Sequence, residues 1–240
     1  TSVEVVDMIL VLDISSSMLA DDFQPNRLEA VKITAANFIN SRKSDRIGII
    51  VFAGESFIQC PLTVDKSVLK SLIDEINIVS KEYDGTAIGM AIANATNRLR
   101  KSLVKSKVMV LLSDGSNNSG EIDPRTAAEL ASQYDIKIYT IGAGTNQAFT
   151  KIPGRGLIKN EIDEGTLKFI ANKTGGKFFR ATDIKALESI YNEIDILERS
   201  EIEVKEYSNY TEIYIWILLP ALILGLLMEI YKIFIFRSMI

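Results

Sequence analysis

The sequence predicts an α/β fold built on a doubly wound, mostly parallel sheet. Short runs of almost continuous apolar residues alternate with longer segments that have helical spacing. The apolar runs lack the polar alternation of a sheet with one wet face, so we expect helices on both faces. Two of the runs end in an aspartate, Asp13 and Asp114, at the carboxyl end of a strand, where such sheets carry their binding sites.

The first half of the chain contains three predicted strands and three predicted helices. Leu28, Val31 and Ala35 share one helical stripe, and a similar stripe recurs further on. The segment SFIQCPLT contains Pro61 and is therefore expected to be an antiparallel edge strand. The expected elements are strand 3–13, helix 25–43, strand 45–53, edge strand 56–63, helix 66–77 and an Ala-rich helix within 84–103.

The second half repeats the alternation, with capping residues at the helix starts. Asp123 and Pro124 give an N-cap followed by proline at the first helical position, and Asp163 and Asp183 are further caps. A Gly-Gly pair ends the helix before the last strand. The expected elements are strand 106–115, helix 124–133, strand 136–144, a small hairpin around PGRG within 145–162, helix 163–173, strand 177–181 and helix 183–198.

The last thirty residues differ in composition from the domain before them. Residues 213–228 carry no charge, and a helix over 213–236 would span about 36 Å, against a hydrocarbon core of about 30 Å. A buried core helix or a peripheral amphipathic helix is the alternative. We expect a domain over 1–198, a charged linker over 199–212, a transmembrane helix over 213–236 and a tail over 237–240.

Flanking charges predict the orientation of this segment. Lys232 and Arg237 follow the apolar core, whereas the preceding linker has more acids than bases. The positive-inside rule then places the domain outside the cytoplasm.

The composition excludes several kinds of chemistry. The 240-residue chain has no histidine, which excludes Ser-His-Asp and Cys-His nucleophiles and every His-ligated zinc or iron site. Its single cysteine permits neither an internal disulfide nor a thiolate cage. Any metal must therefore be held by oxygen, which favours Mg²⁺, with Mn²⁺ or Ca²⁺ as alternatives. The net charge of −4 argues against nucleic acid as a partner.

Oxygen-bearing side chains gather at the predicted carboxyl edge of the sheet. Two are carboxylates and three are neutral hydroxyls, which together could supply most of an octahedral shell around a small hard cation. In an extended loop, positions 13, 15 and 17 face one side, so we expect Ser16 to point away. The candidate metal ligands are Asp13, Ser15, Ser17, Thr86 and Asp114.

Three motifs make this pattern specific. DISSSM, DGTAIG and LLSDG, in this order and on these elements, resemble the metal-ion-dependent adhesion site (MIDAS) of von Willebrand factor type A (VWA) domains over residues 3–198. The resemblance implies a Rossmann-like VWA fold and a metal bound by the hydroxyls, with the aspartates acting directly or through water. It also implies that an Asp or Glu of a partner protein completes the coordination. The D-x-S-x-S group matches Asp13, Ser15 and Ser17, the lone threonine matches Thr86, and the second aspartate matches Asp114.

Within the family, the chain is similar to the bacterial membrane-bound Bat type, including BatA. MLADDFQPNRLEAVK, RIGIIVFAGESFIQCPLT, GEIDPRTAAELA and the apolar terminal segment carry the likeness. It implies a non-enzymatic protein of the bacterial inner membrane that acts in stress tolerance or complex assembly. Other Bat-type VWA proteins and a MoxR-class AAA+ ATPase complex are the implied partners. Such proteins usually carry membrane segments before the domain; because this chain begins at Thr1, we expect it to be processed or cut from a longer one.

Two other readings of the sequence stay open. A Mg-dependent aspartyl-phosphate phosphatase or phosphotransferase would use Asp13 as nucleophile, but its usual second acid would fall on Ser15. GAGTNQ resembles part of a dinucleotide-binding loop, although Gln147 takes the place of the third glycine. Asp21 and Asp22 are expected to be solvated, with a role at the rim of the metal site as the alternative.

Overall fold

The structure of the chain is a computed structural model that divides into two compact units, Thr1–Ile196 and Leu197–Ile240. The structure describes residues 5–42, 44–145, 149–152, 156–159, 162–207, 218–222, 224–228 and 232.

The first unit is built on a six-stranded sheet with the order β3-β2-β1-β4-β5-β8, and a separate hairpin pairs β6 with β7. Neighbouring strands of the large sheet are parallel, except that β3 runs antiparallel to β2. The predicted fold class, the antiparallel edge strand and the small hairpin are therefore confirmed. The strands are β1 (Val6–Asp13), β2 (Arg46–Phe52), β3 (Ser56–Thr63), β4 (Ser106–Ser113), β5 (Ile136–Ala143), β6 (Phe149–Ile152), β7 (Gly156–Lys159) and β8 (Phe178–Ala181).

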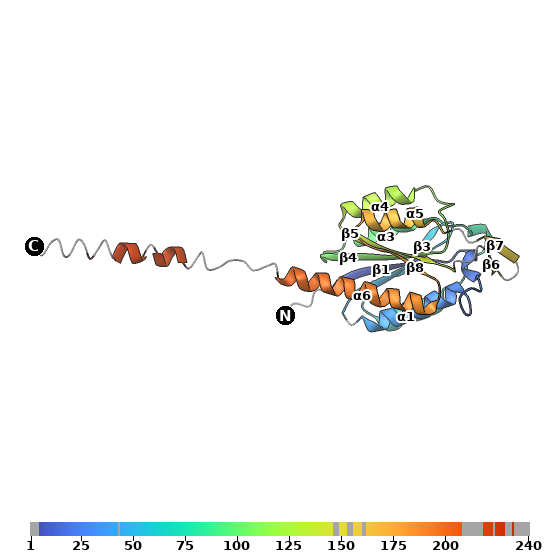
Figure 1. Cartoon of the computed structure of the whole chain (residues 1–240), viewed down its shortest axis with the longest axis horizontal. Helices are drawn as coiled ribbons and strands as arrows, with labels where there is room; N and C mark the ends of the chain where they lie inside the picture. The colour runs from blue at the N-terminus through green and yellow to red at the C-terminus, as the bar shows by residue number, and fades with distance from the viewer. Residues whose placement is uncertain are drawn as a thin grey trace, which may run out of the picture. The chain divides into compact units, whose positions relative to one another are not determined.

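Helices cover both faces of the sheet, as predicted for a doubly wound fold. In Figure 1, α3, α4 and α5 lie on one face, and α1 and α6 lie together on the other. The α-helices are α1 (Arg27–Ser41), α2 (Lys66–Asp74), α3 (Ile88–Leu99), α4 (Pro124–Gln133), α5 (Glu164–Lys173) and α6 (Ile184–Tyr207).

The central strand β1 shows how the two layers form. All eight of its residues are buried, including the aspartate at its end. Ile9 and Val11 belong to the cluster beneath α3 and α4, whereas Met8 and Leu10 alternate with them along the strand and point to the other face. A strand buried on both faces needs a continuous apolar run, which is why the sequence signal here was strong.

Two local expectations are wrong. The loop after β1 is not extended throughout, because Ser16–Leu19 forms a short 3-10 helix, η1. The last helix does not end near residue 198, because α6 continues as one helix to Tyr207. A charged segment without apolar periodicity gives little sequence signal for a helix, although its side chains are compatible with one.

In the described part of the second unit, the structure contains no helix of the length and apolarity needed to cross a membrane. Residues 218–222 and 224–228 are helical, and their leucines and Met228 are exposed. The other residues of the predicted transmembrane helix, 213–236, lie outside the described residues except for Lys232.

Helix α1, which begins beside the sheet edge that carries the candidate site, depends on its N-cap. The side-chain oxygen of Asn26 accepts a hydrogen bond from the Glu29 backbone N–H at 2.9 Å. We expect Asn26→Ala to lower the free energy of unfolding by about 1 kcal/mol, because this N–H loses its partner. Urea unfolding would measure the change. The exposed helical residue Asn97 is the control, since Asn97→Ala should leave stability unchanged or slightly raised.

Candidate metal centre

The candidate site lies where the strand order of the sheet reverses. Strand β1 pairs with β2 on one side and with β4 on the other, so the loops after β1 and β4 leave in opposite directions. Asp13 is the last residue of β1, and Asp114 directly follows β4. Such a switch point leaves a crevice at the carboxyl edge, which positions both carboxylates as predicted.

Asp13 is completely buried, and both of its carboxylate oxygens accept hydrogen bonds. The Ser15 backbone N–H donates to Oδ1 at 2.9 Å, and the Ser113 hydroxyl donates to Oδ2 at 2.8 Å. Ser113 is the last residue of β4, so this contact joins the ends of the two central strands. Ser113 was not among the predicted site residues. Its position next to Asp114 is the sequence signal that could have indicated a role at the site.

The hydroxyls of Ser15 and Ser17 connect the first motif to Asp114. Their Oγ atoms lie 2.9 Å apart, and the Ser17 hydroxyl donates to Asp114 Oδ1 at 2.7 Å. Ser15 is buried and Ser17 is half-buried. The two hydroxyls face the same side, as predicted. The predicted cause was an extended loop, whereas Ser17 lies in the short helix η1.

Thr86 reaches the same region from the loop before α3. A Cβ atom added to Gly115 would lie 3.6 Å from Thr86 Oγ1, so the threonine hydroxyl lies beside the residue that follows Asp114. Its backbone is fixed by Asn118, whose side-chain oxygen accepts from the Thr86 N–H at 2.8 Å. Gly85 before it has φ of +142°, and a Cβ there would lie 2.3 Å from Ser119 Oγ. The positive φ therefore favours glycine in the DGT motif, and any side chain here would also displace the Ser119 hydroxyl.

Ser16 does point away from the candidate ligands, as predicted, and it has a function of its own. Its hydroxyl donates to Asp84 Oδ2 at 2.6 Å, and its backbone N–H donates to Asp84 Oδ1 at 2.9 Å. Asp84 is the first residue of DGT, so this pair joins the first and second motifs. Asp84 lies within the DGTAIG motif, but the motif alone predicts no role for it.

Arg27 is the largest omission from the predicted site. Only 1% of its side chain is exposed, and it lies between two carboxylates. Its Nη1 donates to Asp114 Oδ2 at 2.7 Å, while Nε and Nη2 donate to the two oxygens of Asp22 at 2.7 and 2.6 Å. Asp22 was expected to be solvated; instead its side chain is 5% exposed and also accepts from the Thr145 backbone N–H at 3.0 Å. Asp21 is exposed, as expected.

The GAGTNQ segment after β5 contributes to the arginine's environment. Gly144 has φ of +153°, and a Cβ added there would lie 3.1 Å from Arg27 Nη2. This glycine therefore leaves room for the guanidinium group. Residues 146 and 147 of the segment lie outside the described residues.

The buried carboxylates perturb one another. Burial, followed by the charge of Asp114, raises the pKa of Asp13 to about 7. Burial also raises the pKa of Asp114, against the opposing charge of Arg27. Burial opposes ionisation of Asp22 too, but hydrogen bonds from Arg27 and Thr145 hold its pKa below the ordinary value. With all three acids ionised, Arg27 is shared between Asp22 and Asp114, and Arg180 lies near enough to interact with Asp22, so the carboxylates outnumber these two guanidinium groups.

This arrangement fits a divalent cation held by oxygen. Among the described residues, no group of three or more His, Cys, Asp and Glu side chains is placed to hold a metal ion. The predicted donors are two carboxylates with hydroxyls, a combination that suits Mg²⁺, Mn²⁺ or Ca²⁺. A divalent cation would stabilise the ionised forms of Asp13 and Asp114, which burial disfavours. The structure brings Asp13, Ser15, Ser17 and Asp114 together, with Thr86 beside Gly115. Their role as ligands stays a prediction.

The fold and this carboxylate–hydroxyl site define a class of metal-dependent adhesion domains. The family model for the von Willebrand factor type A domain matches residues 7–193. The chain belongs to this family. It is further a Bat-type member, because BatB and an aerotolerance-related membrane protein are among its structural neighbours at 30% identity or more.

Sequence relatives cover most of the chain. It is 34% identical to an uncharacterized protein of Borreliella burgdorferi over 94% of this chain and 68% of the relative. It is 29% identical to a UPF0353 protein of Nocardia farcinica over 78% of this chain and 62% of the relative. A UPF0353 protein of Mycolicibacterium paratuberculosis is 30% identical, and the match covers 59% of its length. The chain thus spans about three fifths to two thirds of these relatives.

Solved structures of similar fold include Bat-type proteins. BatB from Bacteroides thetaiotaomicron has a TM-score of 0.71 at 31% identity, with 81% of this chain and 99% of that one covered. An aerotolerance-related membrane protein from Bacteroides fragilis has a TM-score of 0.70 at 30% identity, with 79% and 96% covered. Proximal thread matrix protein 1 of the mussel byssus, solved with a zinc-occupied MIDAS motif, shares the fold at 24% identity and a TM-score of 0.64, with 79% and 44% covered.

Proposed function

We propose that this chain is a membrane-anchored binding module that captures partner proteins through a divalent metal ion. Asp13, Ser15, Ser17, Thr86 and Asp114 would hold the ion, with Mg²⁺ as the expected species. The observation that carries the proposal is the convergence of two buried carboxylates and a chain of hydroxyls on one switch point, where burial disfavours the ionised form of both acids unless a cation is bound.

The donor set also supports the kind of partner. The two aspartates would neutralise the ion, whereas neutral hydroxyls leave it able to attract one more anion. A carboxylate of a partner's Asp or Glu is the natural protein group for that position. No base or nucleophile is required for such capture, and VWA domains are generally interaction modules. We propose binding without catalysis.

Asp13 is poorly placed for the aspartyl-phosphate alternative. A nucleophilic carboxylate needs access to a phosphoryl group, whereas Asp13 is fully buried and both of its oxygens accept hydrogen bonds. Ser15 stands where a second acid would be needed. Mass spectrometry after incubation with a phosphoryl donor would show an aspartyl-phosphate adduct if this alternative held.

The cellular setting that we propose is the bacterial inner membrane. Residues 213–236 would form the anchor, and residues 1–198 would form the binding domain outside the cytoplasm, joined by residues 199–212. The apolar composition of the anchor supports this proposal, as does the description of the Bacteroides fragilis neighbour as an aerotolerance-related membrane protein. Other Bat-type VWA proteins and a MoxR-class ATPase complex are the proposed assembly partners, in stress tolerance or protein-complex assembly.

Removing one of the two buried carboxylates should strongly weaken metal binding. We expect Asp13→Ala to weaken Mg²⁺ or Mn²⁺ binding by at least about 100-fold, since changes even outside the ligand shell cost 10- to 100-fold. Calorimetric titration of the full chain with Mg²⁺, and paramagnetic resonance with Mn²⁺, would measure this. Asp21→Ala is the matched control, because Asp21 is an exposed acid in the following loop and should leave the affinity unchanged.

Partner binding should follow the metal. Proteins captured by the wild-type chain in Mg²⁺ should be lost both with Asp13→Ala and with EDTA, but retained with Asp21→Ala. If every partner survives both treatments, the metal-dependent function is wrong. If the chain binds the metal but captures the same partners with and without it, the ion has a structural role only.

A further inference from the structure

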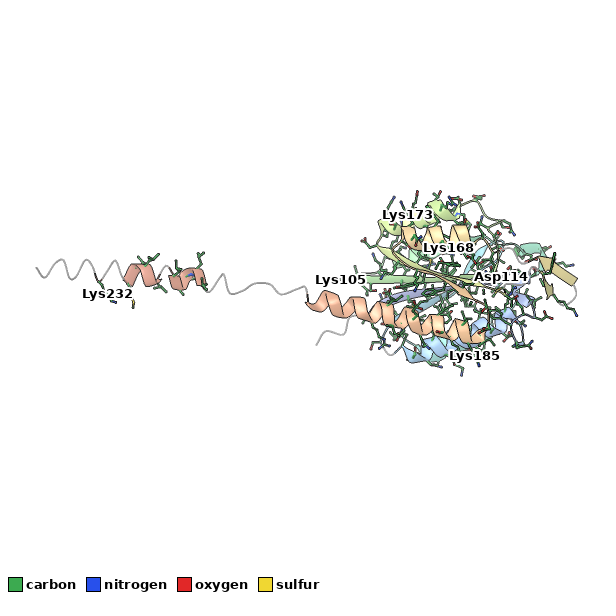
Figure 2. The ribbon with its side chains drawn as sticks, viewed as in Figure 1. Lys105, Asp114, Lys168, Lys173, Lys185 and Lys232 are labelled. Carbon is green, nitrogen blue, oxygen red and sulfur yellow. The ribbon has the colours of Figure 1, made fainter. Side chains whose placement is uncertain are left out.

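The sheet places two chemically different surfaces at its opposite ends. Asp114 follows β4 at the end that carries the metal centre, whereas Lys105 directly precedes β4. The eight residues of β4 separate these ends by about 26 Å. Figure 2 shows Lys105 and Asp114 at opposite ends of the sheet.

The loop between α3 and β4 concentrates positive charge at the end opposite the metal centre. The sequence 98–107, RLRKSLVKSK, contains five cations in ten residues. Arg98, Lys101 and Lys105 are exposed, and within the described residues no ion pair is recorded for any of them. Cations at the end of α3 interact favourably with its dipole, which explains part of this composition.

The helix dipole does not explain Leu103, whose side chain is fully exposed, at 101% of the reference area. Hydrogen bonds of Ser102 fix the conformation of the loop at this point. The Ser102 backbone N–H donates to Leu99 O at 2.9 Å, its hydroxyl donates to the buried Asp7, and the Val104 N–H donates to Ser102 Oγ at 3.0 Å. Ser102 thus ties the loop to β1 and holds Leu103 outward, between two lysines.

The path of the chain leaves the domain at this same end. Arg42, at the C-cap of α1, forms an ion pair with Asp195 of α6 at 2.8 Å. Residues 197–207 are helical and span about 16 Å, and five further residues can add at most about 18 Å before residue 213. The chain between Ile196 and residue 213 can therefore reach at most about 35 Å from the point where α6 leaves the first unit.

We propose that this basic loop, defined as Arg98, Lys101, Leu103 and Lys105, docks on an anionic lipid surface. The three cations contact lipid phosphates, and Leu103 enters the interfacial region. The inference rests on the proposed membrane anchor, which keeps the loop at high local concentration near the bilayer. Charge complementarity favours anionic lipid, because each Lys or Arg near such a surface strengthens the attraction and salt screens it.

The test uses the full chain in lipid nanodiscs with an environment-sensitive fluorophore on Leu103→Cys. Cys60 is buried and should not react in the folded protein. We expect a blue shift in discs containing phosphatidylglycerol, little shift in phosphatidylcholine, and reversal in 1 M salt. The double variant Lys101→Gln, Lys105→Gln should lower the docked-to-undocked ratio about 30-fold, since each charge contributes about fivefold.

Two controls and a competitor keep the result specific. Lys168→Gln with Lys185→Gln removes the same charge from α5 and α6 and should leave the fluorescence shift unchanged. A fluorophore on Phe149→Cys, on the exposed side of the separate hairpin, should not shift. If the fluorophore does not shift in anionic discs but shifts on addition of an oligonucleotide at physiological salt, with the same lysine dependence, the surface recognises nucleic acid and the lipid proposal is wrong.

The outcome for the loop can be separated from that for the anchor. Retention in the disc in 1 M salt reports the apolar segment, and the shift at position 103 reports the loop. Retention without a shift in anionic discs overturns this inference and leaves the proposed anchor intact. Binding to anionic vesicles that is lost in 1 M salt and depends on Lys101 and Lys105 supports the loop but contradicts the anchor.

Discussion

Replacing Arg27 by methionine is expected to lower the free energy of unfolding of the metal-free protein by about 3–5 kcal/mol. The guanidinium of Arg27 is 1% exposed and is the shared partner of Asp22 and Asp114, which are themselves buried. Without it, two carboxylates would remain in a dry environment without their counter-charge. Methionine has a similar reach, so the loss reports charge more than volume. Urea unfolding in EDTA would measure the change.

The same substitution should make the protein more dependent on metal. Removing a positive charge that competes for Asp114 leaves the cluster more negative, so Mg²⁺ should restore more stability to Arg27→Met than to the wild type. Arg98→Met, at an exposed position of α3, should stay within about 0.5 kcal/mol of the wild type in both buffers. Equal destabilisation with and without Mg²⁺ would show that Arg27 does not act on the metal centre.

The sequence was informative wherever a local pattern determined the position of a residue. Asp13 ends a continuous apolar run, and Asp114 ends another, so both carboxylates could be assigned to the carboxyl edge of one sheet. Strand order then brings them together without any further information. Thr86 could be located in the same way, because a glycine turn and a helix start are both visible in DGTAIG.

The remaining parts of the site depend on pairing across long sequence separations. Arg27 and Asp114 are 87 positions apart, and Ser16 and Asp84 are 68 positions apart. An arginine at the first position of a helix usually lies in solvent, and no periodicity distinguishes the buried exception. The expectation that Asp22 is solvated failed for the same reason, because its partner is identified only after the loops have packed.

Gly89 illustrates a residue that the motif contained but the sequence could not explain. It is the second glycine of DGTAIG and lies in the first turn of α3. A Cβ atom at this position would lie 1.9 Å from the backbone oxygen of Ile122 and 2.7 Å from its carbonyl carbon. The clash is with backbone, so no rotamer change can relieve it. The glycine therefore allows α3 to approach the segment before α4, a few residues from Thr86.

We expect Gly89→Ala to lower the free energy of unfolding by about 4 kcal/mol or more, or to prevent folding, because α3 and the segment before α4 must separate. The better helix propensity of alanine, about 1 kcal/mol, is far too small to compensate. Gly165→Ala is the matched control: Gly165 is also the second residue of its helix, but its nearest neighbour would be a carboxylate oxygen of Asp163 at 3.3 Å. That variant should unfold at the wild-type urea concentration or slightly above it. If Gly89→Ala were equally stable and bound Mg²⁺ normally, close packing of α3 would not be what positions Thr86.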